Sequence, residues 1–254
     1  MKTKLFTLGM FVLSVLIVSG CGSRAQGVHG SQPPAHVTVI ENSGVLVSQE
    51  YDLAVFEQIQ VENTFDVEIK QGDTFRVVTR VEENAAPYVR VTVEGNRLKI
   101  GLDPKKTYHM INVSLRAEIT LPKLTGLSLG GASQATLESF QLAEEADVAL
   151  EGASSLYGEV EADKINLEAS MAAAVTLSGS AQDVVLKTWG GSRVDLGGLG
   201  VANADVEASG GSTAIVNPSG RLDARADGGA HVYYLGGPTL GRISTSGGAL
   251  IAQR

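Results

Sequence analysis

The chain is poor in the residues that build most globular cores and most active sites. Only 5% of its 254 residues are aromatic, one is cysteine, and helical periodicity is nearly absent. A single cysteine excludes a disulfide framework, and few aromatics argue against a core of Phe and Trp. The histidines are scattered and suggest neither a zinc site nor a catalytic triad: His29, His36, His109 and His231. We therefore predict no cofactor and no metal.

Positive charge is also scarce. The formal net charge is −8, with 20 Lys and Arg against 28 Asp and Glu. Without Lys2 and Lys4, which lie in an export signal described below, 18 basic residues face the same 28 acidic ones and the net charge becomes −10. Nucleic acids and anionic lipid headgroups bind through many Lys and Arg contacts. Neither is an expected partner.

Glycine is abundant, with 30 residues, and much of it lies in a repeat. From about residue 124 onward, small-residue corners recur with centres 18 to 21 residues apart. The corners are Gly131-Ala132-Ser133, Gly152-Ala153-Ser154, Met171-Ala172-Ala173, Gly190-Gly191-Ser192, Gly210-Gly211-Ser212, Gly228-Gly229-Ala230 and Gly247-Gly248-Ala249. A unit of this length cannot bury an apolar face alone and must stack on a copy of itself.

Alignment of the repeats on the corner centres gives apolar or small residues at every odd offset. The column five residues before the centre reads Leu127, Val148, Leu167, Leu186, Val206, Ala224 and Ile243. A period of two places these side chains on one face of extended strands. The sequence therefore predicts an all-β fold: a right-handed parallel β-helix of about seven rungs over residues 123–254. Glycine supplies the backbone freedom needed at the corners.

Even offsets should point outward. Four residues before the centre, Glu168, Lys187, Glu207 and Arg225 should form a ladder of alternating charge, with rungs about 4.8 Å apart. A solvated face with weak ion pairs is the expected reading of this ladder, and a recognition stripe is the alternative. Outward aromatic and basic side chains give a possible interaction surface: Trp189, Arg193, Tyr157 and Tyr233. Trp189 and Arg193, on one rung, should lie side by side and could stack on a sugar or a partner.

A different column holds an acidic pair. Asp205 and Asp223 should stack on neighbouring rungs with carboxylates about 5 Å apart, which is compatible with a retaining glycosidase. Asp147 and Asn166 should lie lower in the same column, where oxygen ligands could hold Ca²⁺. The commoner role of such residues is to accept backbone hydrogen bonds at strand starts. We therefore expect no enzymatic activity and keep the pair as an alternative.

Residues 37–122 are strand-like but less regular. Val89, Val91 and Val93 lead through Gly95-Asn96 to a further strand, which is a two-residue hairpin signal. Residues around Asn63 mimic the spacing of the repeat and predict a degenerate first rung. The segment should form a β-rich layer that caps the coil. The last rung, in contrast, has no obvious cap and could mediate self-association.

The first residues have the pattern of an export signal. Residues 1–20 hold Lys2 and Lys4, an apolar stretch of about 14 residues and a small-residue junction, too short for a membrane span. Cys21 follows at that junction, which resembles the lipobox of bacterial lipoproteins. The resemblance implies cleavage after residue 20 and acylation of Cys21. Residues 21–36, rich in Gly, Ser, Gln and Pro, should form a flexible tether.

Several of these motifs together resemble one bacterial family. The motif residues Phe56, Ile59, Val61, Asn63, Phe65, Val67, Ile69, Gln71-Gly72, Val91, Val93, Leu98, Ile100, Leu127 and the corners from Gly131 onward are similar to the putative auto-transporter adhesin, head GIN domain family. The similarity runs from about residue 52 to 248. It implies a β-helical envelope lipoprotein or secreted protein, with no established ligand.

These observations predict a noncatalytic, lipid-anchored envelope protein that acts as an adhesin or binding scaffold for an unknown protein or glycan. It should lie outside the cytoplasm, on the outer membrane if the source is Gram-negative. Two alternatives remain open at this point: a carbohydrate-active enzyme using Asp205 and Asp223, and a structural envelope component that self-associates.

Overall fold

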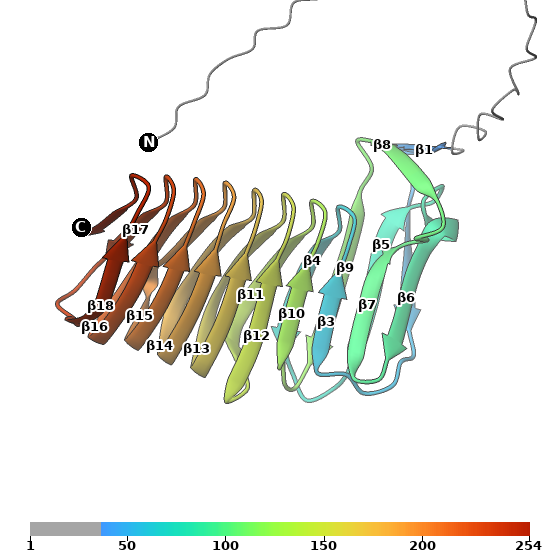
Figure 1. The fold of residues 1–254 in the computed structure, drawn as a ribbon. Coiled ribbons are helices and arrows are strands. Elements are labelled where there is room, and N and C mark those ends of the chain that lie inside the picture. The colour runs from blue at the N-terminus through green and yellow to red at the C-terminus, as the bar shows by residue number, and fades with distance from the viewer. Residues whose placement is uncertain (1–36) are drawn as a thin grey trace, which may run out of the picture. The chain divides into compact units, whose positions relative to one another are not determined.

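A computed structural model describes residues 37–254, which form an all-β structure around a parallel β-solenoid of about 6 turns (Figure 1). The N-terminal portion contains β1 (Val37–Glu41), β2 (Leu46–Tyr51), β3 (Gln58–Val61), β4 (Asp66–Gln71), β5 (Arg76–Glu82), the 3₁₀ turn η1 (Ala86–Tyr88), β6 (Val89–Glu94), β7 (Arg97–Leu102), β8 (Thr107–Ile111) and β9 (Leu115–Leu121). The coil contains β10 (Gly126–Leu129), β11 (Gln134–Gln141), β12 (Glu145–Leu150), β13 (Ser155–Ala169), β14 (Ala174–Thr188), β15 (Arg193–Ala208), β16 (Thr213–Ala226), β17 (His231–Tyr234), β18 (Thr239–Thr245) and β19 (Leu250–Gln253). The predicted signal peptide of residues 1–20, Cys21 and the tether of residues 21–36 lie outside the described residues.

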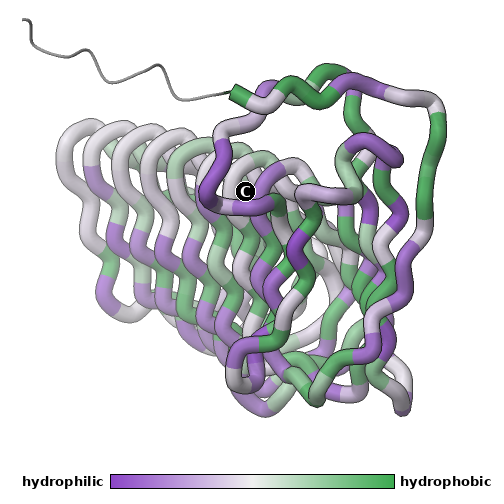
Figure 2. The backbone as a smooth tube through the Cα atoms, turned by 90° about the vertical axis from the view of Figure 1, so that its right-hand side faces the viewer, coloured by the Kyte–Doolittle hydropathy of each residue, from purple (hydrophilic) through white to green (hydrophobic). Residues whose placement is uncertain are grey.

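Each regular turn of the coil has two arms joined by a corner. β13, β14, β15 and β16 each run from one corner almost to the next, and every arm pairs in parallel with the same arm of the neighbouring turn. The predicted inward column is in register and buried: Leu127, Val148, Leu167, Leu186 and Val206. Hydrophobic and hydrophilic residues alternate along the backbone, and hydrophilic positions recur from turn to turn (Figure 2). The prediction of a stacked β-solenoid is confirmed.

The corners require a left-handed backbone. The residue before each corner centre has a φ of 63° to 78°, and it is glycine at every corner except Met171. A Cβ added at Gly152 would lie 2.5 Å from the carbonyl oxygen of Gly131 in the preceding turn. Asn63 has a φ of 68° and forms the equivalent corner between β3 and β4, as the spacing predicts. Glycine therefore serves both the conformation and the close stacking of the turns.

Buried serines tie successive corners together. The hydroxyl of Ser154 donates to the carbonyl oxygen of Glu151 in its own corner at 2.9 Å and to that of Leu129 in the preceding turn at 3.3 Å. Ser212 repeats the pattern toward Ser209 and Thr188. These hydroxyls pair inside the apolar interior, where an unpartnered polar group would cost about 1–3 kcal/mol.

The N-terminal portion adds a turn out of sequence order. β3 pairs in parallel with β10 on one side and β7 on the other, and β4 lies in the same way between β11 and β9. The turn made of β3 and β4 is therefore inserted between two turns that follow it in the chain. The degenerate rung around Asn63 is confirmed, but it is not the outermost one.

Antiparallel strands close this end of the coil. β6 pairs antiparallel with β7 through the predicted Gly95-Asn96 turn, and β5 pairs antiparallel with β9 and with β2. β1 and β8 form a separate two-stranded parallel sheet. One 17-stranded sheet includes both β9 and β10. These antiparallel strands and the coil thus share a continuous hydrogen-bonded structure across residue 122.

The other end of the coil is open. β18 pairs only with β16 and β19 only with β17 among the described strands. Two inward side chains of this last turn are exposed, Leu240 at 49% and Ile243 at 40%, and Leu250 on the outward face is 42% exposed. An apolar surface and unpaired strand edges therefore coincide at residues 239–253.

Candidate functional site

The outward charge ladder has the predicted register. Glu168, Lys187, Glu207 and Arg225 lie opposite one another on successive turns. Among the described residues, only one of these neighbours forms an ion pair, in which Lys187 Nζ lies 3.8 Å from Glu168 Oε1. Both side chains are about half exposed, and such pairs contribute about 1 kcal/mol or less. The ladder is a solvated face that can also present charge to a partner.

Trp189 stands beside this ladder. Its side chain is 43% exposed and lines an open depression of about 250 Å³ with Lys187, Glu207, Arg225 and Asp227. Arg193 lies beyond the corner, on the following arm, and does not line the depression. The structure thus surrounds Trp189 with charges of both signs but separates it from Arg193. An indole among polar groups is a suitable platform for a sugar ring or a side chain.

Tyr157, Arg193 and Tyr233 occupy the outward face of the arms that follow the corners. Tyr157 is 43% exposed. Tyr233 is in the same column, four turns further, or roughly 19 Å at about 4.8 Å per turn. The Arg254 guanidinium lies 5.8 Å from the Tyr233 ring centroid, and the His231 ring contacts it edge-on. Neighbouring side chains thus cover part of the Tyr233 ring, whereas the exposed Tyr157 ring is accessible to a partner.

Asp205 and Asp223 are opposite each other on β15 and β16, as predicted. Asp223 accepts hydrogen bonds from Arg221 Nε at 2.6 Å, Arg221 Nη2 at 3.0 Å and the backbone N–H of Arg242 at 2.6 Å. The Arg221 guanidinium, followed by the Arg242 N–H, holds the pKa of Asp223 well below its ordinary value. A retaining glycosidase needs one carboxyl that donates a proton. Asp223 is an anion that hydrogen-bonds the last turn to its neighbour, so it is not suited to be the proton donor of such a pair.

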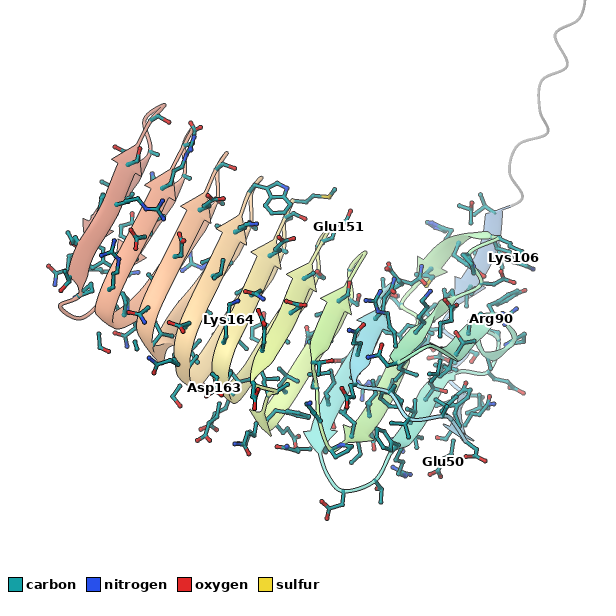
Figure 3. All side chains as sticks on the ribbon, turned by 60° about the horizontal axis from the view of Figure 1, so that its bottom comes forward. Glu50, Arg90, Lys106, Glu151, Asp163 and Lys164 are labelled. Atoms are coloured by element: carbon teal, nitrogen blue, oxygen red, sulfur yellow. The ribbon has the colours of Figure 1, made fainter. Side chains whose placement is uncertain are left out.

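The lower part of the same column forms a polar ladder. Asn166 Nδ2 donates to Asp147 Oδ1 at 2.8 Å and to Glu145 Oε1 at 3.0 Å. The Lys164 ammonium lies 2.6 Å from Glu145 Oε1, and this contact lowers the pKa of Glu145. Lys164 and Asp163 stand near the edge of the coil opposite the corner residue Glu151 (Figure 3). Residues 37–254 contain no cluster of three or more side chains arranged to hold a metal ion.

A groove in the N-terminal portion was not predicted. It has a volume of about 620 Å³, and its walls come from β3, β6, β7 and the residues that lead into β8. Arg90 and Lys106, which project from this portion (Figure 3), line it together with Glu62, Lys99 and Tyr108. Arg90 is paired with Asp103 at 3.0 Å, and the Lys105 N–H, followed by Arg90, lowers the pKa of Asp103. The out-of-order pairing of β3 with β7 builds this groove, and no motif signals it.

Comparison with known proteins agrees with the fold. A family model described as "Putative auto-transporter adhesin, head GIN domain" matches residues 55–238. No curated protein matches the chain. Within residues 37–254, no helix is long and apolar enough to cross a membrane.

Solved structures with the same fold include proteins of Bacteroides and Parabacteroides species. A crystal structure of a putative adhesin from Bacteroides fragilis superposes with a TM-score of 0.78 at 21% identity, covering 85% of this chain and 100% of that one. A putative lipid binding protein and a putative adhesin, both from Parabacteroides distasonis, give TM-scores of 0.64 and 0.62 at 17% and 18% identity. Each match covers 85% of this chain and 100% of the other. At these identities the likeness shows the fold.

Proposed function

Because the chain belongs to the putative auto-transporter adhesin, head GIN domain family, we propose that it is a noncatalytic binding scaffold of a bacterial cell envelope. The observation that carries the proposal is the pair of extended outward faces, on which side chains repeat in register over successive turns. The depressions on these faces are open, as at Trp189. Such a surface suits adhesion to an extended protein or glycan better than catalysis on an enclosed substrate.

The depression at Trp189 is the part of this surface we propose for contact. A large exposed indole supplies apolar contact area, and Lys187, Glu207 and Arg225 around it supply donors and acceptors. Interface energy concentrates in aromatic and arginine side chains with polar surroundings. A glycan or a protein segment that lies along the coil would meet these groups on successive turns.

We further propose that Cys21 is acylated and anchors the scaffold to a membrane, which is the outer membrane if the source is Gram-negative. Support comes from the small-residue junction in front of the chain's single cysteine and from a family that suggests a surface or envelope location. The test is growth with a labelled fatty acid. The full-length protein should take up label and sediment with membranes, and Cys21→Ser should do neither. Labelling of the Cys21→Ser variant would contradict the anchor.

The binding proposal is tested with cells that display the full-length protein. They should retain at least one member of a glycan and envelope-protein array, and Trp189→Ala should reduce that retention about tenfold. Tyr157→Ala is the matched control, because Tyr157 is equally exposed, at 43%, but lies on the other arm. If the wild-type protein retains nothing, the scaffold proposal fails. If only Tyr157→Ala reduces retention, the contact surface is the other face.

The open end of the coil favours a second candidate, in which two copies associate end to end. Leu240 and Ile243, which face inward in the last turn, are exposed at this end. The opposite end is covered by β2, β5 and β6, so that two copies would meet through their open ends. A two-fold axis perpendicular to the sheets would place β18 antiparallel to β18 of the second copy. Apolar contact and edge pairing would then both be satisfied.

Sedimentation equilibrium of the full-length protein tests this candidate. We expect a concentration-dependent dimer in the wild type and a monomer in Ile243→Lys, which places a charge in the exposed interior of the last turn. Leu46→Lys on β2 is the control, because Leu46 is similarly exposed, at 47%, at the capped end. A wild-type monomer at every concentration would remove the candidate, as would equal effects of the two lysines.

A further inference from the structure

Two arginines lie side by side on the capped end of the coil. Arg80 on β5 and Arg116 on β9 are directly opposite each other in an antiparallel pair, and both are exposed. Directly opposite residues in such a pair have Cβ atoms about 5 Å apart. The two guanidinium groups can therefore reach the same small ligand.

Neither arginine side chain has an intramolecular partner among the described residues. Within residues 37–254, neither guanidinium has a partner at ion-pair or hydrogen-bond distance, although Asp66 lies opposite Arg116 on β4. Arg76, on the same strand and face as Arg80, is by contrast paired with Glu50 at 3.0 Å. Like charges directly opposite each other destabilise a sheet. An anion that accepts hydrogen bonds from both guanidinium groups would offset this repulsion.

The surroundings restrict the kind of anion. Arg80 and Arg116 line a depression of about 190 Å³ with the carboxylates of Asp66, Glu68 and Glu118 and the half-buried Val78. A sulfate or phosphate monoester can accept from both guanidinium groups. Val78 offers apolar contact to a ring, and the carboxylates accept hydrogen bonds from hydroxyl groups. The same carboxylates repel a polyanion such as a nucleic acid or an anionic bilayer.

We propose that Arg80 and Arg116 form a binding site for a sugar that carries one sulfate or phosphate monoester. The ester group bridges the two guanidinium groups, and the neutral ring lies over Val78 with its hydroxyls toward Glu118 and Asp66. The proposal rests on the proposed binding function and adds a ligand chemistry and a second place to it. This site lies in the N-terminal portion, whereas Trp189 lies in the corner between β14 and β15. Either proposed binding site can therefore fail its test without the other.

Calorimetric titration of the full-length protein tests the site. The probes are N-acetylglucosamine 6-sulfate, the corresponding 6-phosphate, unmodified N-acetylglucosamine and sodium sulfate. We expect both esters to bind, and the unmodified sugar and free sulfate to bind at least about tenfold more weakly. Equal binding of free sulfate and the sulfated sugar would overturn the sugar part of the proposal. Absence of binding by both esters would overturn all of it.

Substitutions then locate the binding. Arg80→Ala and Arg116→Ala should each weaken binding of the sulfated sugar about tenfold or more, and Arg80→Lys should weaken it less. Arg76→Ala is the matched control and should bind as the wild type does, because Arg76 lies on the same face but is already paired with Glu50. Equal losses in Arg76→Ala and Arg80→Ala would indicate a general field effect and would contradict the site.

A stability measurement separates binding from a structural role. The sulfated sugar should raise the melting temperature of the wild type and of Arg76→Ala, but not of Arg116→Ala. Without ligand, Arg116→Ala should melt at the wild-type temperature or above it, because a repulsion has been removed. A lower melting temperature of ligand-free Arg116→Ala would mean that the arginine stabilises the fold, and would contradict the proposal. Retention of the protein through Arg80 and Arg116 on phosphatidylglycerol vesicles would also contradict it.

Discussion

The same inward column has opposite environments at the two ends of the coil. Leu98 and Ile59, in the first two turns of the column, are 0% and 1% exposed, whereas Ile243 in the last turn is 40% exposed. The side chains are equally apolar and have the same position on the turn. The difference lies in what covers them: antiparallel strands lie over the first turn, and no described strand lies over the last.

This difference shows how a repeat fold acquires an end. A turn of the coil cannot terminate itself, because its strand edges always offer another pairing. At the first end, β5 and β6 run antiparallel to the coil and take up those edges. At the last turn the equivalent edges belong to β18 and β19, and no further described strand pairs with them. The stability of the molecule should therefore be uneven along its axis.

The largest test of this unevenness is a matched pair of substitutions in the inward column. Ile59→Ala should lower the free energy of unfolding by about 2–5 kcal/mol, because a buried side chain leaves a cavity. Ile243→Ala should lower it by about 1 kcal/mol or less, because the side chain is already in contact with solvent. Urea unfolding measures both values. Equal losses would mean that the last turn is as well covered as the first.

A second pair compares a coil corner with the hairpin of the cap. Gly152 and Gly95 both have positive φ, 78° and 65°, but a Cβ meets backbone only at Gly152. Gly152→Ala should cost about 2–4 kcal/mol, from the left-handed backbone and the overlap together. Gly95→Ala should cost about 1 kcal/mol, from the backbone alone. Thermal or urea unfolding measures the gap, and its disappearance would show that the corners can separate freely.

The contrast between the ends also explains what the sequence could predict. The coil was predictable because each strand pairs one repeat further along, so that the spacing of Leu127, Val148 and Leu167 carries the register directly. The conformation of Asn63 could be anticipated from the same spacing. The same spacing predicted which outward residues lie opposite each other on successive turns. It did not predict which of them form ion pairs, because long side chains on an exposed face have many rotamers.

The insertion of β3 between β7 and β10 could not be predicted. It joins segments whose separation in the chain follows no period, and nothing local distinguishes it from a sequential order. The groove beside Lys106 and the placement of Arg80 opposite Arg116 both depend on such pairings. Trp189 and Arg193 do not lie side by side, because the corner between them turns the chain onto the other arm.

Among the seven corners of residues 131–249, the one that has methionine in place of glycine offers a test in the stabilising direction. Met171 has a φ of 63°, and its side chain is 57% exposed. Met171→Gly should remove the steric cost of the left-handed backbone, about 1–2 kcal/mol, and add about 0.5–1 kcal/mol of chain entropy cost. A net gain of about 0.5–1 kcal/mol in urea unfolding is expected. A loss would show that the Met171 side chain stabilises its neighbours more than its backbone conformation costs.

The smallest expected effect concerns the hydrogen bonds through which Asp223 stabilises the open last turn. The pKa of Asp223 is lower in the folded protein than its ordinary value, because Arg221 and the Arg242 N–H stabilise the carboxylate. As the pH falls, the unfolded chain therefore binds the proton first, and stability contributed by Asp223 above about pH 5 is lost toward pH 2. Asp223→Asn should show a weaker loss of stability over this range than the wild type.

Asp205→Asn is the control for this last prediction, because Asp205 occupies the same column one turn earlier and has no ion-pair partner among the described residues. Hydrogen exchange at the Arg242 amide, read together with urea unfolding from pH 5 to pH 2, locates the effect. Acidification should lower the protection factor of the Arg242 amide, the ratio of the exchange rate of an unstructured amide at the same pH to its own, in the wild type and in Asp205→Asn, but change it less in Asp223→Asn, where that amide has already lost its charged acceptor. If all three proteins respond alike, the open turn is held by its pairing with β16 alone, and the contrast between the two ends rests on strand coverage without a contribution from this carboxylate.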